Sequence, residues 1–172
     1  MIHNISKKQH NSKMCFVCGI HNEAGLNARF YETDGNEVVA MIKPCNEHQG
    51  YPGRMHGGIA STILDETIGR AISIGVNENI WGVTLELTVK YKKPVPLDED
   101  IKIVARVVQD NGRSYIGSGE IILPNGDIAV SAEGKYLKLA LDKITQGDFA
   151  DTDWFLLNEE SDPDQIEIPK KG

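Results

Sequence analysis

The sequence predicts a single α+β domain in which an antiparallel sheet surrounds one long helix. Residues 57–74 contain no proline, and their apolar side chains fall on most sides of a helical wheel, so we expect this helix to be buried. From Val83 to Val89 apolar and polar residues alternate, which is the period of a strand with one buried face. A helix this apolar has to be covered by such a sheet, which gives a layered α+β architecture.

Two strands are expected before the helix and four after it. The first two, at residues 27–31 and 37–42, flank a turn at residues 34–36 (Asp-Gly-Asn) and predict a hairpin. The later strands are expected at residues 83–89, 101–108, 115–123 and 128–139, separated by turn residues at 94–98, 111–112 and 125–126. Consecutive hairpins of this kind favour an antiparallel sheet.

The chain has 172 residues, the length of one domain. We expect residues 14–140 to form this domain, with a flexible polar N-terminus at residues 1–13 and an acidic tail at residues 141–172. The tail carries nine acidic side chains and three lysines, so it holds −6 of the net charge of −7. Its apolar residues 154–157 are the one feature that favours docking on the sheet or covering a site.

The composition excludes several kinds of partner. A net charge of −7 argues against binding to nucleic acid, because phosphate binding needs a basic surface. No apolar run approaches the roughly 20 residues that a membrane helix needs, and residues 1–13 lack the apolar segment of a secretory signal. We therefore expect a cytoplasmic protein with no nucleic-acid and no membrane partner.

Three cysteines raise the question of a metal. Cys15 and Cys18 have the spacing of a metal-binding pair, but structural zinc sites usually have four ligands in paired spacing. Only His21 and Cys45 could complete such a set. The sequence therefore favours buried, reduced thiols, with no metal and no cofactor.

The segment His56-Gly57-Gly58 opens the expected helix. The first N–H groups of a helix have no partner within it and lie at its positive end. Glycines leave these groups uncovered, so the segment could polarise a carbonyl oxygen that gains negative charge. The alternative is a tight turn in which only glycine fits.

Asp65 lies well inside the helix, where aspartate is a poor helix former and is rarely buried alone. It shares a helix face with small residues that would let a large ligand approach, namely Gly58, Ser61, Thr62 and Gly69. The alternative is a solvated acid on an exposed face. Glu66 precedes Arg70 by four residues, the favourable order for a helix ion pair, so we assign Glu66 a structural role.

The spacing of Gly57 and Asp65 also bears on assembly. We expect the two residues to point to opposite sides of the helix and to lie about 12 Å apart along its axis. One chain could hardly direct both groups at a single carbonyl group, whereas two helices about a two-fold axis could. The spacing therefore predicts an obligate homodimer with two sites across the interface.

The same residues resemble a known family. His56-Gly57-Gly58 followed by residues 59–66 (IASTILDE) is similar to the signature of the PaaI-type thioesterases of the hotdog superfamily. Residues 15–19 (CFVCG), Asn22, residues 25–26 (GL), 50–53 (GYPG) and 91–94 (YKKP) resemble further motifs of that family. The resemblance covers roughly residues 15–139. It implies a hotdog fold, homodimers that often pair into homotetramers, and hydrolysis of acyl-CoA or another acyl thioester.

The resemblance also implies roles for particular residues. Asp65 matches the acid that activates water or attacks the thioester, and Gly57 matches the glycine whose N–H polarises its carbonyl. His56 matches a histidine that helps to hold this region, and Thr84 matches a hydroxyl that positions water. Gly58, Ser61 and Thr62 are expected to contact substrate.

One position departs from the family pattern. Many relatives carry Asn or Gln six residues before the histidine, where this chain has Gly50, with His48 or Gln49 as possible substitutes. Gly50 is therefore expected beside the thioester without a side-chain contact of its own. The chain has no Gly-x-Ser-x-Gly motif, which argues against a serine hydrolase. The predicted enzyme is an acyl-CoA thioesterase; the alternatives are a non-catalytic acyl-CoA-binding protein and a hotdog hydratase or dehydratase.

Overall fold

A computed structural model describes residues 1–75, 79–145 and 149–169. Its strands are β1 (Ile2–Lys8), β2 (Asn11–Ser12), β3 (Arg29–Thr33), β4 (Val38–Ile42), β5 (Ile80–Tyr91), β6 (Ile101–Asp110), β7 (Ser114–Ile122), β8 (Ile128–Ala140), β9 (Trp154–Phe155) and β10 (Gln165–Glu167). Its α-helices are α1 (Gly57–Arg70) and α2 (Phe149–Thr152), and 3-10 turns span Asn46–His48, Ala71–Ser73 and Leu141–Lys143.

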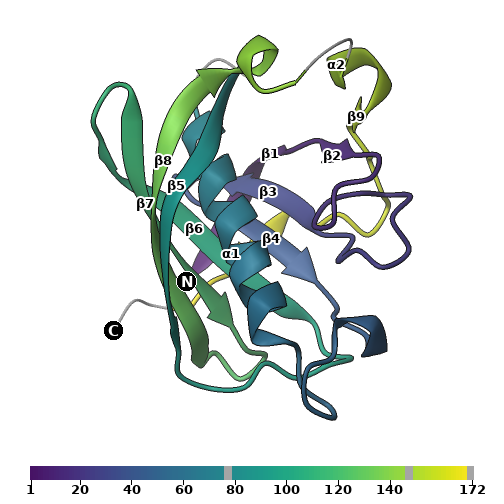
Figure 1. The fold of residues 1–172 in the computed structure, drawn as a ribbon. Coiled ribbons are helices and arrows are strands. Elements are labelled where there is room, and N and C mark those ends of the chain that lie inside the picture. Colours follow the sequence, from purple (N-terminus) through teal and green to yellow (C-terminus); the bar gives the residue numbers. More distant parts are fainter. Residues whose placement is uncertain (76–78, 146–148, 170–172) are drawn as a thin grey trace.

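Eight strands form one antiparallel sheet in the order β10-β1-β3-β4-β6-β7-β8-β5. The sheet curves around α1, which lies along its inner face (Figure 1). Strands β2 and β9 form a separate two-stranded pair. The predicted α+β architecture, an antiparallel sheet around one long helix, is confirmed. The six strands expected from the sequence all occur, within about three residues of the expected ends.

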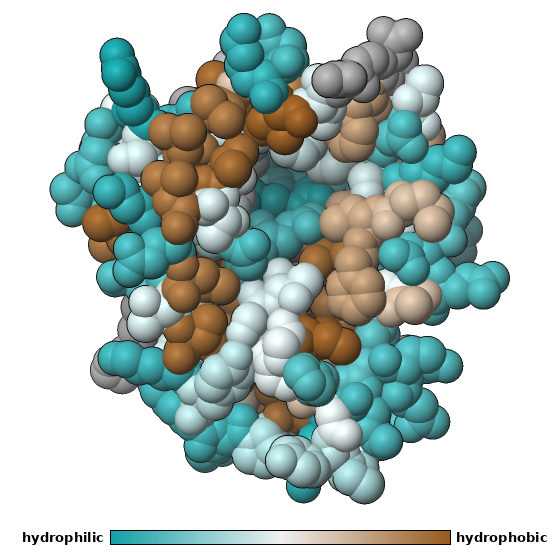
Figure 2. All heavy atoms as spheres, viewed as in Figure 1, coloured by the Kyte–Doolittle hydropathy of each residue, from teal (hydrophilic) through white to brown (hydrophobic). Residues whose placement is uncertain are grey.

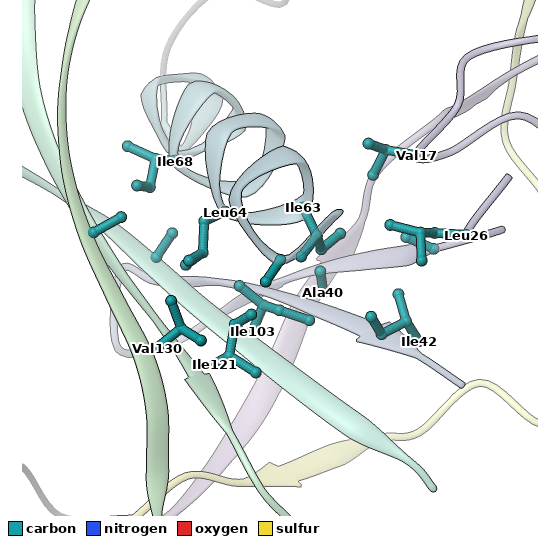
Figure 3. Close-up of a cluster of buried hydrophobic side chains, with 14 of the residues drawn as sticks. Val17, Leu26, Ala40, Ile42, Ile63, Leu64, Ile68, Ile103, Ile121 and Val130 are labelled. Atoms are coloured by element: carbon teal, nitrogen blue, oxygen red, sulfur yellow. The ribbon is translucent and has the colours of Figure 1, made fainter. Parts of the chain in front are cut away.

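The core lies between α1 and the sheet (Figure 3). Ile63, Leu64 and Ile68 of α1 are fully buried. They face sheet residues that include Ala40, Ile103, Ile121 and Val130. Burial of each such side chain stabilises the fold by about 1.5–3 kcal/mol. Gly117 of β7 lets the helix approach closely, since a Cβ there would lie 2.4 Å from Ile68 Cγ2.

Both chain ends differ from expectation. The N-terminal residues, expected to be flexible, form β1 and β2, and the acidic tail supplies β9 and β10. Ile166 and Ile168 are buried on the outer face of the sheet, in a cluster with Tyr31, Val39 and Val104. Strands β1 and β10 form on this outer face because Ile5 and Ile166 cover apolar side chains that would otherwise be exposed.

The helix is shorter than expected: α1 ends at Arg70 and continues as the 3-10 turn Ala71–Ser73. Within the described part of the chain, no helix has the length and apolar character to cross a bilayer. The cytoplasmic location stays a prediction.

Candidate active site

Asp65 is held by two hydroxyl groups from neighbouring strands. Thr84 of β5 donates a 2.8 Å hydrogen bond to Asp65 Oδ1, and Tyr136 of β8 donates a 2.9 Å bond to the same oxygen. The β5–β8 register shifts between Thr84 and Glu86, so Leu85 is the extra residue of a bulge. Bulges re-aim side chains, and this one lies beside the acid.

Tyr136 is a site residue that the sequence reasoning missed. Burial, followed by the charge of Asp65, raises the pKa of its phenol, so the hydroxyl remains a donor to the carboxylate. Its ring stacks on Tyr115 at 5.1 Å, and Tyr115 donates to Gly69 O at 2.8 Å. A tyrosine at a buried position of a strand usually has a polar partner for its hydroxyl. The alternation of buried positions along β8 could therefore have identified Tyr136 as a candidate.

The start of α1 carries the expected N–H groups. His56 is the N-cap residue, and its Nδ1 accepts the Gly58 N–H at 2.9 Å. The Gly57 N–H finds no acceptor among the residues that the structure describes. It therefore remains available at the positive end of the helix.

The hydroxyls of Ser61 and Thr62 are used within the first turns of the helix. Ser61 donates to Gly57 O at 3.2 Å and also contacts the Tyr91 hydroxyl, while Thr62 donates to Gly58 O at 2.8 Å. Tyr91 of β5 donates to Gly57 O at 3.1 Å. These bonds fix the helix start against β5 and place neither hydroxyl at Asp65.

The loop before the helix shows whether His48 or Gln49 replaces the side chain that is missing at Gly50. A Cβ at Gly50 would lie 3.0 Å from the His56 Cα, so position 50 is indeed close to the expected site. His48 does not replace the missing side chain, because it is buried and its Nε2 lies 3.2 Å from Ala24 O and Gly25 O. Gln49 instead accepts the Gly53 N–H at 3.0 Å.

Gly57 and Asp65 do not face opposite ways, and that expectation is wrong. Gly57 contacts Tyr91 and Asp65 contacts Thr84, and both partners belong to β5. Their separation of eight residues corresponds to about 80° around the helix, since each residue turns it by about 100°. The axial separation of about 12 Å is unaffected, so the two groups still lie too far apart to act on one thioester carbonyl.

A cavity of about 520 Å³ opens beside Asp65. Figure 2 shows the hollow, with hydrophilic residues at its base and hydrophobic residues along the β5 side of its rim. Its apolar lining comes from the end of the helix, from β5 and from the C-terminal segment, and includes Ile72, Ile80, Trp81, Phe149 and Trp154. Trp154 lies 4.8 Å from Trp81 and stacks on His10. The tail residues, which the sequence left outside the domain, thus form part of the cavity.

A second polar group lines the same cavity. Arg70 donates to Glu66 Oε1 from Nε and Nη2 at 3.0 and 2.8 Å, as the spacing predicted. The Cys15 thiol donates to Glu66 Oε2 at 3.2 Å. The neighbouring Cys15 thiol, helped by the charge of Arg70, lowers the pKa of Cys18 to about 7, and Cys18 in turn raises the pKa of Cys15.

Known proteins share this fold and this helix. A family profile described as thioesterase superfamily matches residues 52–128, the span from the loop before α1 to the start of β8. Acyl-coenzyme A thioesterase 13 of Homo sapiens is 30% identical over 102 residues, which cover 59% of this chain and 71% of that protein. The chain therefore belongs to the thioesterase superfamily, and the predicted hotdog family is confirmed at that level. Its PaaI-type subgroup remains a prediction.

Acyl-coenzyme A thioesterase THEM4 of Mus musculus is 35% identical over 100 residues, covering 56% of this chain and 41% of that protein. A solved thioesterase superfamily protein has a TM-score of 0.65 at 27% identity, covering 70% of this chain and 58% of the other. A hypothetical thioesterase from Streptococcus pneumoniae TIGR4, solved with coenzyme A, has a TM-score of 0.55 at 27% identity, covering 60% and 82%. The chain spans about half the length of the curated relatives it first matches.

Proposed function

We propose that the chain hydrolyses acyl-CoA, or another acyl thioester, to a free acid and a thiol, with Asp65 as the catalytic carboxylate. The observation that carries this proposal is the way in which Asp65 is held. Thr84 and Tyr136 both donate to Oδ1, and no described residue donates to Oδ2. The lone pairs of Oδ2 are therefore available to take a proton from water or to attack the acyl carbon.

The Gly57 N–H is the proposed oxyanion donor. It lies in the first turn of α1, it lacks an acceptor within the described residues, and the helix dipole favours negative charge there. The His56 cap holds the adjacent Gly58 N–H. A thioester carbonyl at this point would gain a donor that needs no rearrangement.

The proposed unit is a homodimer. Gly57 and Asp65 lie about 12 Å apart along one helix, so each site would combine Gly57 of one subunit with Asp65 of the other. Strand β5 is at the edge of the sheet, and its Leu85 and Tyr91 are 55% and 56% exposed. Pairing of two β5 edges would cover these side chains and bring the two α1 helices together. Further pairing into a homotetramer remains a prediction.

The cavity beside Asp65 is the proposed place for the acyl group. It is lined largely by apolar side chains and is close to the carboxylate. Coenzyme A appears with one structural relative, which supports an acyl-CoA as the substrate here. Trp154 of the C-terminal segment would then contact the acyl chain.

Thiol release from a panel of acyl-CoAs, read with a thiol-reactive dye, tests the activity. We expect release with at least one acyl-CoA and a preference set by the acyl chain. Binding without release would instead favour a non-catalytic acyl-CoA-binding protein. Hydration of an enoyl-CoA without thiol release would favour a hydratase.

A subunit-mixing experiment tests the shared site. Asp65→Asn and Gly57→Val are each expected to be inactive, but a mixed dimer would have one site with both changes and one intact site. Random pairing makes about half of the dimers mixed, so activity should return to about a quarter of wild type. If mass spectrometry confirms exchange and no activity returns, the acid and the oxyanion donor do not come from different chains.

A further inference from the structure

Cys15 and Cys18 lie close to the Glu66 carboxylate, which the sequence had assigned to an ion pair with Arg70. The two cysteines lie in the loop between β2 and β3, whereas Glu66 belongs to α1. Their two sulfurs and a Glu66 carboxylate oxygen all lie within 4.8 Å of one another. All three residues line the cavity. A fixed loop and the central helix thus present three metal-ligating atoms to one point.

The loop around the cysteines is built to support negative charge on sulfur. The Val17 N–H donates to Cys15 Sγ at 3.3 Å, and the Ser12 N–H donates to Cys18 Sγ at 3.4 Å. Such bonds favour the charged form of the acceptor. The loop is tight at Gly19, where a Cβ would lie 2.3 Å from Cys15 O. Only glycine fits, and the tight turn keeps both sulfurs on one side.

The Glu66 carboxylate is oriented by Arg70, on the side away from the cysteines. Arg70 binds Oε1 of Glu66 and leaves Oε2 toward the sulfurs. Arg70 is itself fixed by a 2.9 Å bond to His10 O and by its position over the Phe30 ring. Metal-binding carboxylates commonly have an outer partner of this kind, which sets their direction.

The charges of the group suit a divalent cation. Two thiolates and Glu66 would carry three negative charges, and Arg70 offsets one of them, so two remain. Without a cation, the Cys15 thiol donates a hydrogen bond to Glu66. Binding of a cation would release thiol protons.

We propose that Cys15, Cys18 and Glu66 bind a zinc ion whose fourth position opens into the cavity. In tetrahedral zinc sites the ligand distances place sulfur about 3.6 Å from a carboxylate oxygen and about 3.8 Å from another sulfur. The observed 3.2 Å between Cys15 Sγ and Glu66 Oε2, and the 4.8 Å limit for the whole group, lie around these values. Thiolate ligands favour zinc over magnesium or calcium.

The zinc would join the N-terminal loop to α1, and the open position would hold water or a polar atom of a cavity ligand. Neither His21 nor Cys45, the partners that the sequence offered, belongs to the group. The missing ligand comes from a helix 48 residues further along the chain than Cys18, a distance that sequence spacing could not bridge. This site is independent of thioester hydrolysis at Asp65.

Cobalt substitution tests the site directly. The reduced, metal-free full-length chain is titrated with Co²⁺ alone, and the thiolate-to-cobalt absorption band is followed. We expect one equivalent per chain, the band intensity of two thiolates, and displacement of the cobalt by Zn²⁺. Cys18→Ser and Glu66→Gln should each weaken binding by at least about tenfold. Cys45→Ser is the matched control and should bind as wild type does.

Two results would overturn the proposal. One is a wild-type chain that is folded, fully reduced and binds no cobalt through thiolate. The other is binding that depends on Cys45 rather than on Cys18. Mass spectrometry of the chain before reduction adds a check, because a Cys15–Cys18 disulfide in place of bound zinc would make the pair a redox site and not a metal site.

Discussion

Asp65 and Glu66 are consecutive carboxylates on α1, but the helix turns them toward different regions of the molecule. Asp65 faces β5 and β8, and its donors among the described residues are two neutral hydroxyl groups. Glu66 faces the N-terminal loop and is bound by the guanidinium of Arg70. Hydroxyl groups orient a carboxylate without cancelling its charge, whereas a guanidinium neutralises it. Under the proposed function, the partner of each carboxylate, and not its residue type, separates the catalytic acid Asp65 from the structural Glu66.

The largest expected effect comes from removing the charge of Asp65. Asp65→Asn keeps the shape and can still accept from Thr84 and Tyr136, but it can neither take a proton nor attack. We expect kcat to fall by about 10²–10⁴-fold, the range for a positioned acid or base, with little change in thermal stability. Steady-state thiol release and thermal unfolding measure the two quantities.

Glu66→Gln is the matched comparison on the next residue. It weakens the bonds to Arg70, and hydrogen bonds to charged groups contribute about 1.5–3 kcal/mol. The free energy of unfolding should therefore fall by roughly that amount, while kcat falls by less than tenfold. Near wild-type turnover in Asp65→Asn together with an inactive Glu66→Gln would reverse the assignment.

The sequence predicted the Asp65 region much better than the cavity around it. The helix and six strands follow from local periodicity. The family resemblance implied that Thr84 positions water near the acid, and in the structure its hydroxyl donates directly to Asp65. Tyr136 was missed because its partner lies 71 residues away. The contribution of Trp154 to the cavity was missed for the same reason, since it depends on contacts between distant segments. Trp154 reaches the cavity because β9 pairs with β2. Short terminal strands carry too little pattern to be predicted alone, and their position depends on packing between distant segments.

The next prediction concerns Gly57, at the start of α1. Gly57→Ala adds a methyl group 3.4 Å from the Tyr91 ring, an ordinary contact, so the chain should fold and stay as stable as wild type. A methyl group beside the Gly57 N–H would obstruct the approach of the carbonyl. We expect kcat to fall by about 10²-fold, the lower range for loss of an oxyanion donor. Normal hydrolysis in this variant would reduce the two glycines to a turn.

Trp154 lines the same cavity as the two carboxylates and should affect selectivity more than turnover. Its ring lies 5.1 Å from the Arg70 guanidinium and 4.8 Å from Trp81. Trp154→Ala would enlarge the cavity, so KM for the preferred acyl-CoA should rise by about tenfold, which corresponds to about 1.4 kcal/mol of binding. The preference should move toward longer chains.

Phe155→Ala is the matched control for Trp154→Ala. Phe155 is the next residue of β9 and does not line the cavity, because successive strand residues point to opposite faces. An equal change in chain-length preference for both variants would mean that the C-terminal segment acts through its docking and not through the Trp154 ring.

The smallest expected effect concerns the docking of the C-terminal segment, which supplies Trp154 to the lining of the cavity. Burial opposes ionisation of Asp162, but the Glu159 N–H, Lys8 and Tyr31 outweigh it and hold the pKa of this carboxyl below its usual value of 3.8. A lowered folded pKa gives stability that is present above the unfolded value and lost as pH falls through the folded one. Because solvent screens this partly exposed group, Asp162→Asn should lower the free energy of unfolding by only about 1 kcal/mol at pH 7. The gap between variant and wild type should close as the pH falls below about 4.

Urea unfolding at pH 7 and near pH 3.5 measures the gap, and hydrogen exchange at residues 165–167 shows whether β10 opens first. A gap that is independent of pH would mean that the Asp162 charge does not hold the segment, and that Ile166 and Ile168 alone do.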